Sequence, residues 1–125
     1  MGTLIVDDNN LYRQFLVDLL CQHFPVMRIA EAGDGEEVCR QVDAHRPDLV
    51  FMDIHMPGHN GLELTKTIKA SHPDTVVVIL TSYDLPEYQE AARENGASFF
   101  LAKGRTSPSD ILALVRSLAG ALPQR

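Results

Sequence analysis

The sequence predicts a single α/β domain with a parallel sheet at its centre. Short apolar runs alternate five times with longer segments of helical periodicity, which is the pattern of repeated strand–helix units. A chain of 125 residues with 45% hydrophobic content can bury one core, and it is too short for two ordinary domains. Polar residues follow the apolar runs directly, at the carboxyl ends of the strands, where such sheets bind ligands.

Five strands are expected along the chain. Residues 48–53 (DLVFMD) and 75–80 (TVVVIL) are apolar almost throughout, as is typical of central strands that are covered on both faces. The other three strands are predicted at residues 3–6 (TLIV), 27–32 (MRIAEA) and 98–102 (SFFLA). Their alternation with helices favours parallel pairing.

The first two helices have polar caps and an apolar face. The first lies within residues 9–24, with Asn9 or Asn10 as its cap and apolar residues at mixed spacings of three and four. These apolar residues are Leu11, Phe15, Val17, Leu19 and Leu20. The second helix is predicted at residues 34–45, and Asp34 stands in its capping position.

Proline, glycine and serine mark the ends of the other three helices. The third, residues 60–70, has an apolar side and ends before Pro73. The fourth, residues 85–95, has a proline near its first turn and a glycine after its end, and the fifth, residues 107–122, starts with a serine cap and a proline. Gly61 is expected to adopt a backbone conformation that other residues resist.

Composition limits the partners and the compartment. The formal net charge of -6 makes the chain a poor ligand for polyanions, so this domain is not expected to bind DNA by itself. No apolar stretch approaches the roughly 20 residues of a membrane span, and the N-terminus lacks a basic lead, so we expect a cytoplasmic protein without membrane association. Cys21 and Cys39 lie in helical patterns without CxxC spacing, and we expect two buried, reduced thiols.

Acidic, hydroxyl and basic side chains follow four of the predicted strands. They are Asp7 and Asp8 after the first strand, Asp53 at the end of the third, Thr81 and Ser82 after the fourth, and Lys103 after the fifth. Three carboxylates in one pocket repel one another unless a cation lies among them, and ligation by oxygen alone favours Mg²⁺ over zinc. A nearby hydroxyl and ammonium can donate to phosphoryl oxygens, which makes Asp53 the candidate nucleophile for a phosphoryl group.

These residues resemble the receiver domain of response regulators in two-component signalling, the CheY-like family. The resemblance rests on VDDNN after the first strand, MDIHMPGHNG after the third, LTS at the fourth and FFLAKG at the fifth, and it covers residues 3–120. It implies a five-stranded parallel sheet in the order 2-1-3-4-5, with two helices on one face and three on the other. We therefore predict a receiver domain at residues 1–120 and the start of a linker or tail at 121–125, with any output domain outside this chain.

For the acceptor site, the resemblance implies that a sensor histidine kinase phosphorylates Asp53. Asp8, Asp53 and the backbone carbonyl of His55 would bind Mg²⁺ directly, and Asp7 would act through water. Such a domain is not an enzyme for other substrates, because it catalyses only its own phosphorylation and dephosphorylation.

For the switch, the resemblance implies that Thr81 and Lys103, with Ser82 beside them, contact the phosphoryl group. The Thr81 hydroxyl is drawn toward the new acceptor oxygens, and an aromatic ring fills the space that it leaves. In this family the ring stands three residues before the lysine, which is Phe100 here. Movement of Thr81 and Phe100 would reshape the surface formed by the fourth helix, the fifth strand and the fifth helix.

Three positions concern the lifetime of the phosphoryl group and the loop after the lysine. His55 and Tyr83 stand two residues beyond the acceptor aspartate and the threonine, where their rings flank the expected path of water, so we predict slow self-dephosphorylation. Gly104 follows the lysine at a position where many receivers have a cis proline, so loop 104–107 lacks that constraint.

The expected partners follow from the same resemblance. A sensor histidine kinase is expected to dock on the first helix near Asn10, Arg13, Gln14 and Val17, and on loop 104–108. The stretch YQEAARENGASFFLAKG resembles the subfamily with a LuxR-type helix-turn-helix output domain, so DNA would be bound only through a domain outside this chain. Receivers dimerise through the first and fifth helices or through the fourth-to-fifth helix face, which leaves a homodimer open.

Three other functions fit parts of the pattern. A Mg²⁺-dependent phosphohydrolase that passes through an aspartyl phosphate uses an acid two residues after its nucleophile; His55 stands there, and imidazole can do acid–base chemistry, so this alternative stays open. A flavodoxin-like electron carrier needs a loop rich in Ser, Thr and Gly after the first strand, and DDNN would repel a phosphate there. A binding module that is independent of phosphorylation is disfavoured by the full set of expected residue types.

Overall fold

A five-stranded parallel sheet lies at the centre of residues 1–121, the part of the chain that the computed structural model describes. In their order across the sheet, the strands are β2 (Arg28–Ala32), β1 (Gly2–Val6), β3 (Leu49–Met52), β6 (Val76–Thr81) and β7 (Phe99–Ala102). Since β6 and β7 are the fourth and fifth strands of this sheet along the chain, the predicted order 2-1-3-4-5 is confirmed. Each strand begins and ends within one residue of its predicted bounds.

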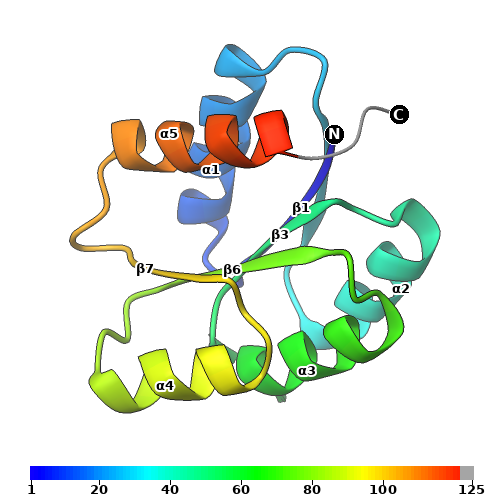
Figure 1. Ribbon diagram of the computed structural model, residues 1–125, viewed down its shortest axis with the longest axis vertical. Coiled ribbons are helices and arrows are strands. Elements are labelled where there is room, and N and C mark those ends of the chain that lie inside the picture. The colour runs from blue at the N-terminus through cyan, green and yellow to red at the C-terminus, as the bar shows by residue number, and fades with distance from the viewer. Residues whose placement is uncertain (122–125) are drawn as a thin grey trace.

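The helices of the described residues cover both faces of the sheet (Figure 1). One face carries α1 (Asn10–His23) and α5 (Pro108–Ala121), and the other carries α2 (Gly35–His45), α3 (Gly61–Ser71) and α4 (Pro86–Glu94). The caps are as predicted: the side chains of Asn9, Asp34 and Ser107 each accept a hydrogen bond from a backbone amide of the first turn. Residues 122–125 of the predicted tail lie outside the described residues. Within residues 1–121, no helix is both long and apolar enough to cross a membrane.

Apolar side chains are buried on both sides of the central strands. Between the sheet and the α1–α5 layer lie Leu16, Leu20, Phe51, Ile111 and Val115, each at most 1% exposed. Full burial of one such side chain stabilises the fold by about 1.5–3 kcal/mol. Under this layer β1 and β3 pair in parallel, so their carboxyl ends lie at the same edge of the sheet.

The apolar face of α1 differs from the prediction. Leu11 is 85% exposed and Phe15 is 38% exposed, whereas the buried residues of this helix are Leu16 and Leu20. Val17 is partly buried against the same cluster. The mixed spacings produce two overlapping apolar stripes along the helix, and the sheet covers only one of them.

The prediction that both cysteines are buried is wrong. Cys21 and Cys39 are exposed free thiols. Each directly follows a buried residue of its helix, Leu20 in α1 and Val38 in α2. One residue along an α-helix turns the side chain by roughly 100°, which moves both thiols off the buried face.

A short hairpin that the sequence did not predict follows β3. Strand β4 (His55–Met56) pairs antiparallel with β5 (His59–Asn60), and Gly58 in the turn has a φ of 75°. The expectation for Gly61 is also wrong, because its φ is not positive. Glycine is needed there for space: a Cβ at this position would lie 2.0 Å from the carbonyl oxygen of Asp53.

Replacement of Gly61 by alanine is expected to destabilise the domain, because the new Cβ would overlap a backbone atom next to the site. Overpacking of this kind costs about 1–3 kcal/mol in the free energy of unfolding. Gly104→Ala is a matched control, since a Cβ there meets nothing within 4 Å, and its effect should stay within about 0.5 kcal/mol. Urea unfolding of the two variants measures the difference, and equal stability would contradict the steric argument.

Candidate functional site

Three carboxylates meet at the carboxyl edge of the sheet. Asp7 and Asp8 follow β1, and Asp53 follows β3, which is hydrogen-bonded to β1. One carboxylate oxygen of each lies within 4.8 Å of the other two. Asp7 and Asp53 are buried, whereas Asp8 is exposed. A set of oxygen donors with one side open to solvent fits a hard divalent cation such as Mg²⁺, and it is the cluster that the sequence predicted.

The ammonium of Lys103 lies among these carboxylates. Its Nζ is 2.7 Å from Asp7 Oδ2 and 3.4 Å from Asp53 Oδ2. The lysine is held in place through its backbone, because its amide donates to the carbonyl oxygen of Thr81 at 2.8 Å and so joins the ends of β7 and β6. Its Nζ also lies 4.4 Å from the centroid of the Tyr12 ring, a cation–π contact. Sequence reasoning missed Tyr12, since spacing alone does not show which way the first turn of α1 faces.

Burial raises the pKa of Asp7 above its ordinary value of 3.8. The hydrogen bond to Lys103 and a hydrogen bond from the amide of Asn9, at 2.9 Å, lower the pKa in part, and the nearby charge of Asp53 raises it again. Burial, together with the negative charges of Asp7 and Asp53, raises the pKa of the Tyr12 hydroxyl to about 12. The carboxylates of Asp7 and Asp53 therefore lose hydration in this pocket, which costs free energy. A further cation would offset that cost.

Asp53 lies where the buried strand opens into a pocket. Its Oδ1 accepts a hydrogen bond from the amide of Ile54 at 2.8 Å, and its Oδ2 faces Lys103. The pocket beside it is lined by the carboxyl-edge residues Asp8, Asp53, Ser82, Tyr83 and Lys103, among others. The carboxylate that the sequence singled out is therefore reachable from solvent although its residue is only 7% exposed.

The predicted switch residues lie on adjacent strands. The register of β6 and β7 places Thr81 and Phe100 on the same face of the sheet. Thr81 is fully buried, and its hydroxyl accepts a hydrogen bond from the amide of Tyr83 at 3.4 Å. Phe100 is partly buried against the core on the α2–α4 side, whereas its neighbour Phe99 is 40% exposed. The two side chains of the predicted switch therefore lie on one face of the sheet, on adjacent strands and two residues apart in register.

Three aromatic rings gather next to the pocket. The centroid of His55 is 4.0 Å from that of Tyr83 and 5.6 Å from that of Tyr88, and the two tyrosines are 5.8 Å apart. His55 and Tyr83 are the residues that sequence position indicated. Tyr88 was missed, because its place depends on how α4 packs beside the hairpin.

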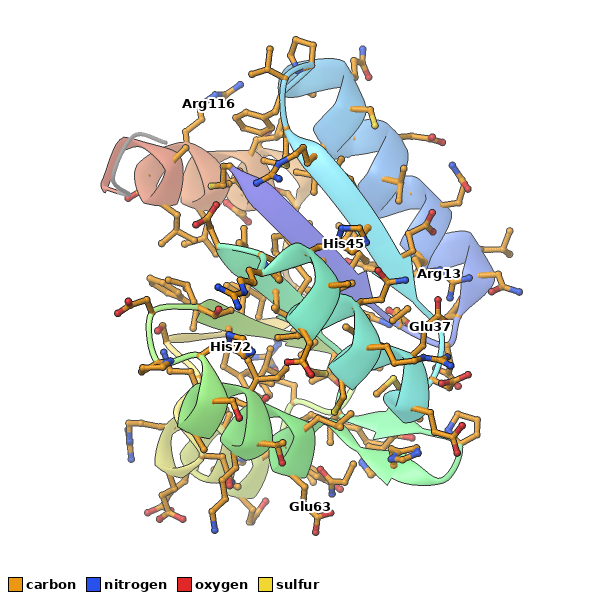
Figure 2. All side chains as sticks on the ribbon, turned by 90° about the vertical axis from the view of Figure 1, so that its right-hand side faces the viewer. Arg13, Glu37, His45, Glu63, His72 and Arg116 are labelled. Atoms are coloured by element: carbon orange, nitrogen blue, oxygen red, sulfur yellow. The ribbon has the colours of Figure 1, made fainter. Side chains whose placement is uncertain are left out.

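Of the four residues of α1 that were predicted to dock a kinase, two are exposed and two are partly buried. Asn10 and Gln14 are exposed, but Val17 packs against the core. Arg13 lies beside the end of β2, where its Nε is 3.1 Å from Glu31 Oε1, and its side chain is only 19% exposed (Figure 2). The exposed apolar residues of α1, Leu11 and Phe15, were instead expected in the core.

The sheet order and the pocket at its carboxyl edge define a CheY-like α/β domain. The model of the response regulator receiver domain family matches residues 3–116, and the chain belongs to this family. A crystal structure of a LuxR-family DNA-binding response regulator from Staphylococcus aureus has a TM-score of 0.85 and 29% identity, and the match covers 94% of this chain and 97% of that one.

Two curated relatives are longer than this chain. The oxygen regulatory protein NreC of Staphylococcus haemolyticus is 35% identical over 115 residues, which are 91% of this chain and 53% of that protein. The protein-glutamate methylesterase/protein-glutamine glutaminase of Nitrosospira multiformis is 40% identical over 87 residues, 70% of this chain and 24% of that protein. The chain therefore spans about half of one relative and about a quarter of the other.

Asp7→Asn is expected to stabilise the metal-free protein at neutral pH. The raised pKa means that folding favours the neutral carboxyl, so the stability that this group contributes is present below pH 3.8 and is lost as the pH rises through its folded-state value. The amide removes the buried charge, and a gain of about 1 kcal/mol would raise the Tm by about 3–5 °C. Thermal unfolding with a chelator present measures this gain, which should shrink on acidification. A lower Tm than that of the unchanged protein at pH 7 would contradict the assignment.

Proposed function

We propose that this receiver domain accepts a phosphoryl group on Asp53 from the phosphohistidine of a sensor histidine kinase, and then changes the surface that it presents to an output partner. The observation that carries the proposal is the position of the Asp53 carboxylate. It ends a buried strand, opens into a pocket, lies 3.4 Å from an ammonium and has two further carboxylates within 4.8 Å. Membership of the receiver family supports the same chemistry.

In the proposed transfer, an Asp53 oxygen forms the new bond to phosphorus. The bond from phosphorus to the donor imidazole nitrogen breaks, and its electron pair stays with the imidazole. Lys103 would donate to one phosphoryl oxygen, and the hydroxyls of Thr81 and Ser82 would donate to others. The Thr81 hydroxyl can turn toward the phosphoryl group, because within residues 1–121 it makes one hydrogen bond, the long one that it accepts from the amide of Tyr83.

The residues present fit a magnesium ion. We expect Asp8, Asp53 and the backbone carbonyl of His55 to hold it directly, with Asp7 acting through water. The bound ion would supply positive charge against the phosphoryl oxygens. The three carboxylates outnumber the single ammonium among them, so the pocket has negative charge available for such an ion.

The proposed output runs through the surface of α4, β7 and α5. A phosphoryl group carries a charge of roughly -1.5 to -2 and draws the Thr81 hydroxyl toward it. Phe100 on the same sheet face would follow into the vacated space. Leu85 and Phe99, which are 54% and 40% exposed, give this region apolar surface that an output partner could cover.

Two partners are proposed for the domain. The kinase would use the exposed part of α1, which is formed by Asn10, Leu11, Gln14 and Phe15, together with loop 104–108. The output would be regulation of transcription through a LuxR-type DNA-binding domain outside this chain, as the LuxR-family structure and the longer relatives suggest. The domain would act on no substrate but its own aspartate.

Incubation with acetyl phosphate and Mg²⁺ should add one phosphoryl group to the protein, measured by intact mass. Asp53→Asn should abolish the adduct, because the amide is not a nucleophile, whereas Asp110→Asn on α5 should leave it unchanged. An adduct that persists in the Asp53→Asn variant would contradict the proposal. Repeated turnover of phosphomonoesters would instead favour the phosphohydrolase.

Tyr83→Ala should shorten the lifetime of the phosphorylated domain several-fold. The Tyr83 ring lies 4.0 Å from His55 at the rim of the pocket, and its loss opens a path for water. Loss of the adduct over time, followed by intact mass, measures the effect. Leu85→Ala removes an exposed side chain that does not line the pocket and should change nothing. An unchanged lifetime in Tyr83→Ala would refute the steric account.

A further inference from the structure

From the contacts of Arg13 we infer that its guanidinium positions the Asp7–Asp8 segment for the metal ion, a role that rests on the function proposed above. Three acceptors surround this side chain. Its Nη1 donates to the backbone carbonyl of Asp7, its Nη2 donates to Asn10 Oδ1 at 2.7 Å, and its Nε donates to Glu31 Oε1 at 3.1 Å. The guanidinium therefore joins β1, α1 and β2 at the edge of the acidic pocket.

The contact with the Asp7 carbonyl acts on the peptide that links Asp7, which is proposed to reach the ion through water, to Asp8, which is proposed to bind it directly. The amide of Asp7 is already fixed by a hydrogen bond to the carbonyl of Ala32 at 3.1 Å. With the carbonyl held by Arg13, both sides of the Asp7 backbone are fixed, and so is the plane of the Asp7–Asp8 peptide. The Asp8 carboxylate is exposed and makes no hydrogen bond or ion pair within residues 1–121, so its direction depends on this backbone.

The surroundings of Arg13 are built to hold the side chain in one place. Glu31 supplies an opposite charge from the edge strand β2, beside which Arg13 lies in Figure 2. Gly33 leaves the space that the guanidinium fills, since a Cβ at that position would lie 3.2 Å from Nη1. The planar, forked donor set of arginine can serve three acceptors at once, which the single ammonium of lysine cannot do with this geometry.

A positioning role and a purely electrostatic role predict opposite results. A positive charge next to the pocket repels Mg²⁺, so removal of the charge alone would tighten metal binding. Loss of the hydrogen bond to the Asp7 carbonyl would weaken metal binding, because the Asp8 carboxylate would no longer be held in one direction. Arg13→Lys separates these effects, since it keeps the positive charge and loses the planar set of hydrogen-bond donors of the guanidinium.

The test is direct titration of Mg²⁺ by calorimetry, with the Mg²⁺-dependent rise in Tm as a second readout. Arg13→Ala and Arg13→Lys should both raise the Kd for Mg²⁺, by about 10-fold for the alanine, the loss typical of residues that orient metal ligands. Arg116→Ala is the matched control: it removes the same charge from α5, at a position well apart from Arg13 in Figure 2, and should leave the Kd unchanged. An unchanged or lower Kd in Arg13→Ala would overturn the inference.

Folding of each variant is checked by thermal unfolding without Mg²⁺. If Arg13→Ala does not fold, Glu31→Gln serves instead, because it weakens one anchor of the guanidinium at a half-exposed position and should raise the Kd a few-fold. An unchanged Kd in that variant would then count against the role. Absence of Mg²⁺ binding in the unchanged protein would overturn the proposed metal site and this role together, whereas normal binding there with no effect of Arg13 would overturn the role alone.

Discussion

The ammonium of Lys103 between Asp7 and Asp53 is the interaction on which the acceptor site depends. Two carboxylates that are buried side by side repel each other, and each of them loses its hydration. The loss of hydration costs several kcal/mol for each carboxylate unless an opposite charge replaces the water. Lys103 reaches both of them, at 2.7 and 3.4 Å. With Asp8 as a third carboxylate, one ammonium leaves an excess of negative charge. Burial, with a smaller contribution from the charge of Asp53, raises the pKa of Asp7, and the excess of negative charge makes the pocket suited to a second cation.

The first turn of α1 supports this arrangement from three directions. The amide of Asn9 donates to Asp7, the ring of Tyr12 lies against the lysine ammonium, and Arg13 donates to the Asp7 carbonyl. None of these residues is a proposed ligand of the phosphoryl group. Helix α1 begins directly after Asp7 and Asp8 and thus orients these two residues. The pairing of β1 with β3 sets their distance from Asp53.

The sequence predicted the buried strands and the acidic cluster from patterns that lie in short stretches of chain, and the resemblance to receiver domains implied the order of the strands. The apolar runs specify buried strands, and residues that follow parallel strands must meet at one edge. The predictions that failed depend on orientation about a helix axis or on close approach across the fold. Two apolar stripes on α1 made Leu11 look buried, and the need for glycine at position 61 arises from a carbonyl eight residues earlier that comes close only after folding. The role of Arg13 was missed for the same reason, since its acceptors lie on three separate elements.

The central claim is that Asp53, among three carboxylates within 4.8 Å, is the one that receives the phosphoryl group. Borohydride reduction tests it most directly, because it converts an aspartyl phosphate to homoserine with release of phosphate and so marks the acceptor permanently. Peptide mass spectrometry of the phosphorylated and reduced protein should find homoserine at position 53 and aspartate at positions 7 and 8. Homoserine at position 7 or 8, or none at any aspartate of a protein that carries the phosphoryl adduct, would contradict the account.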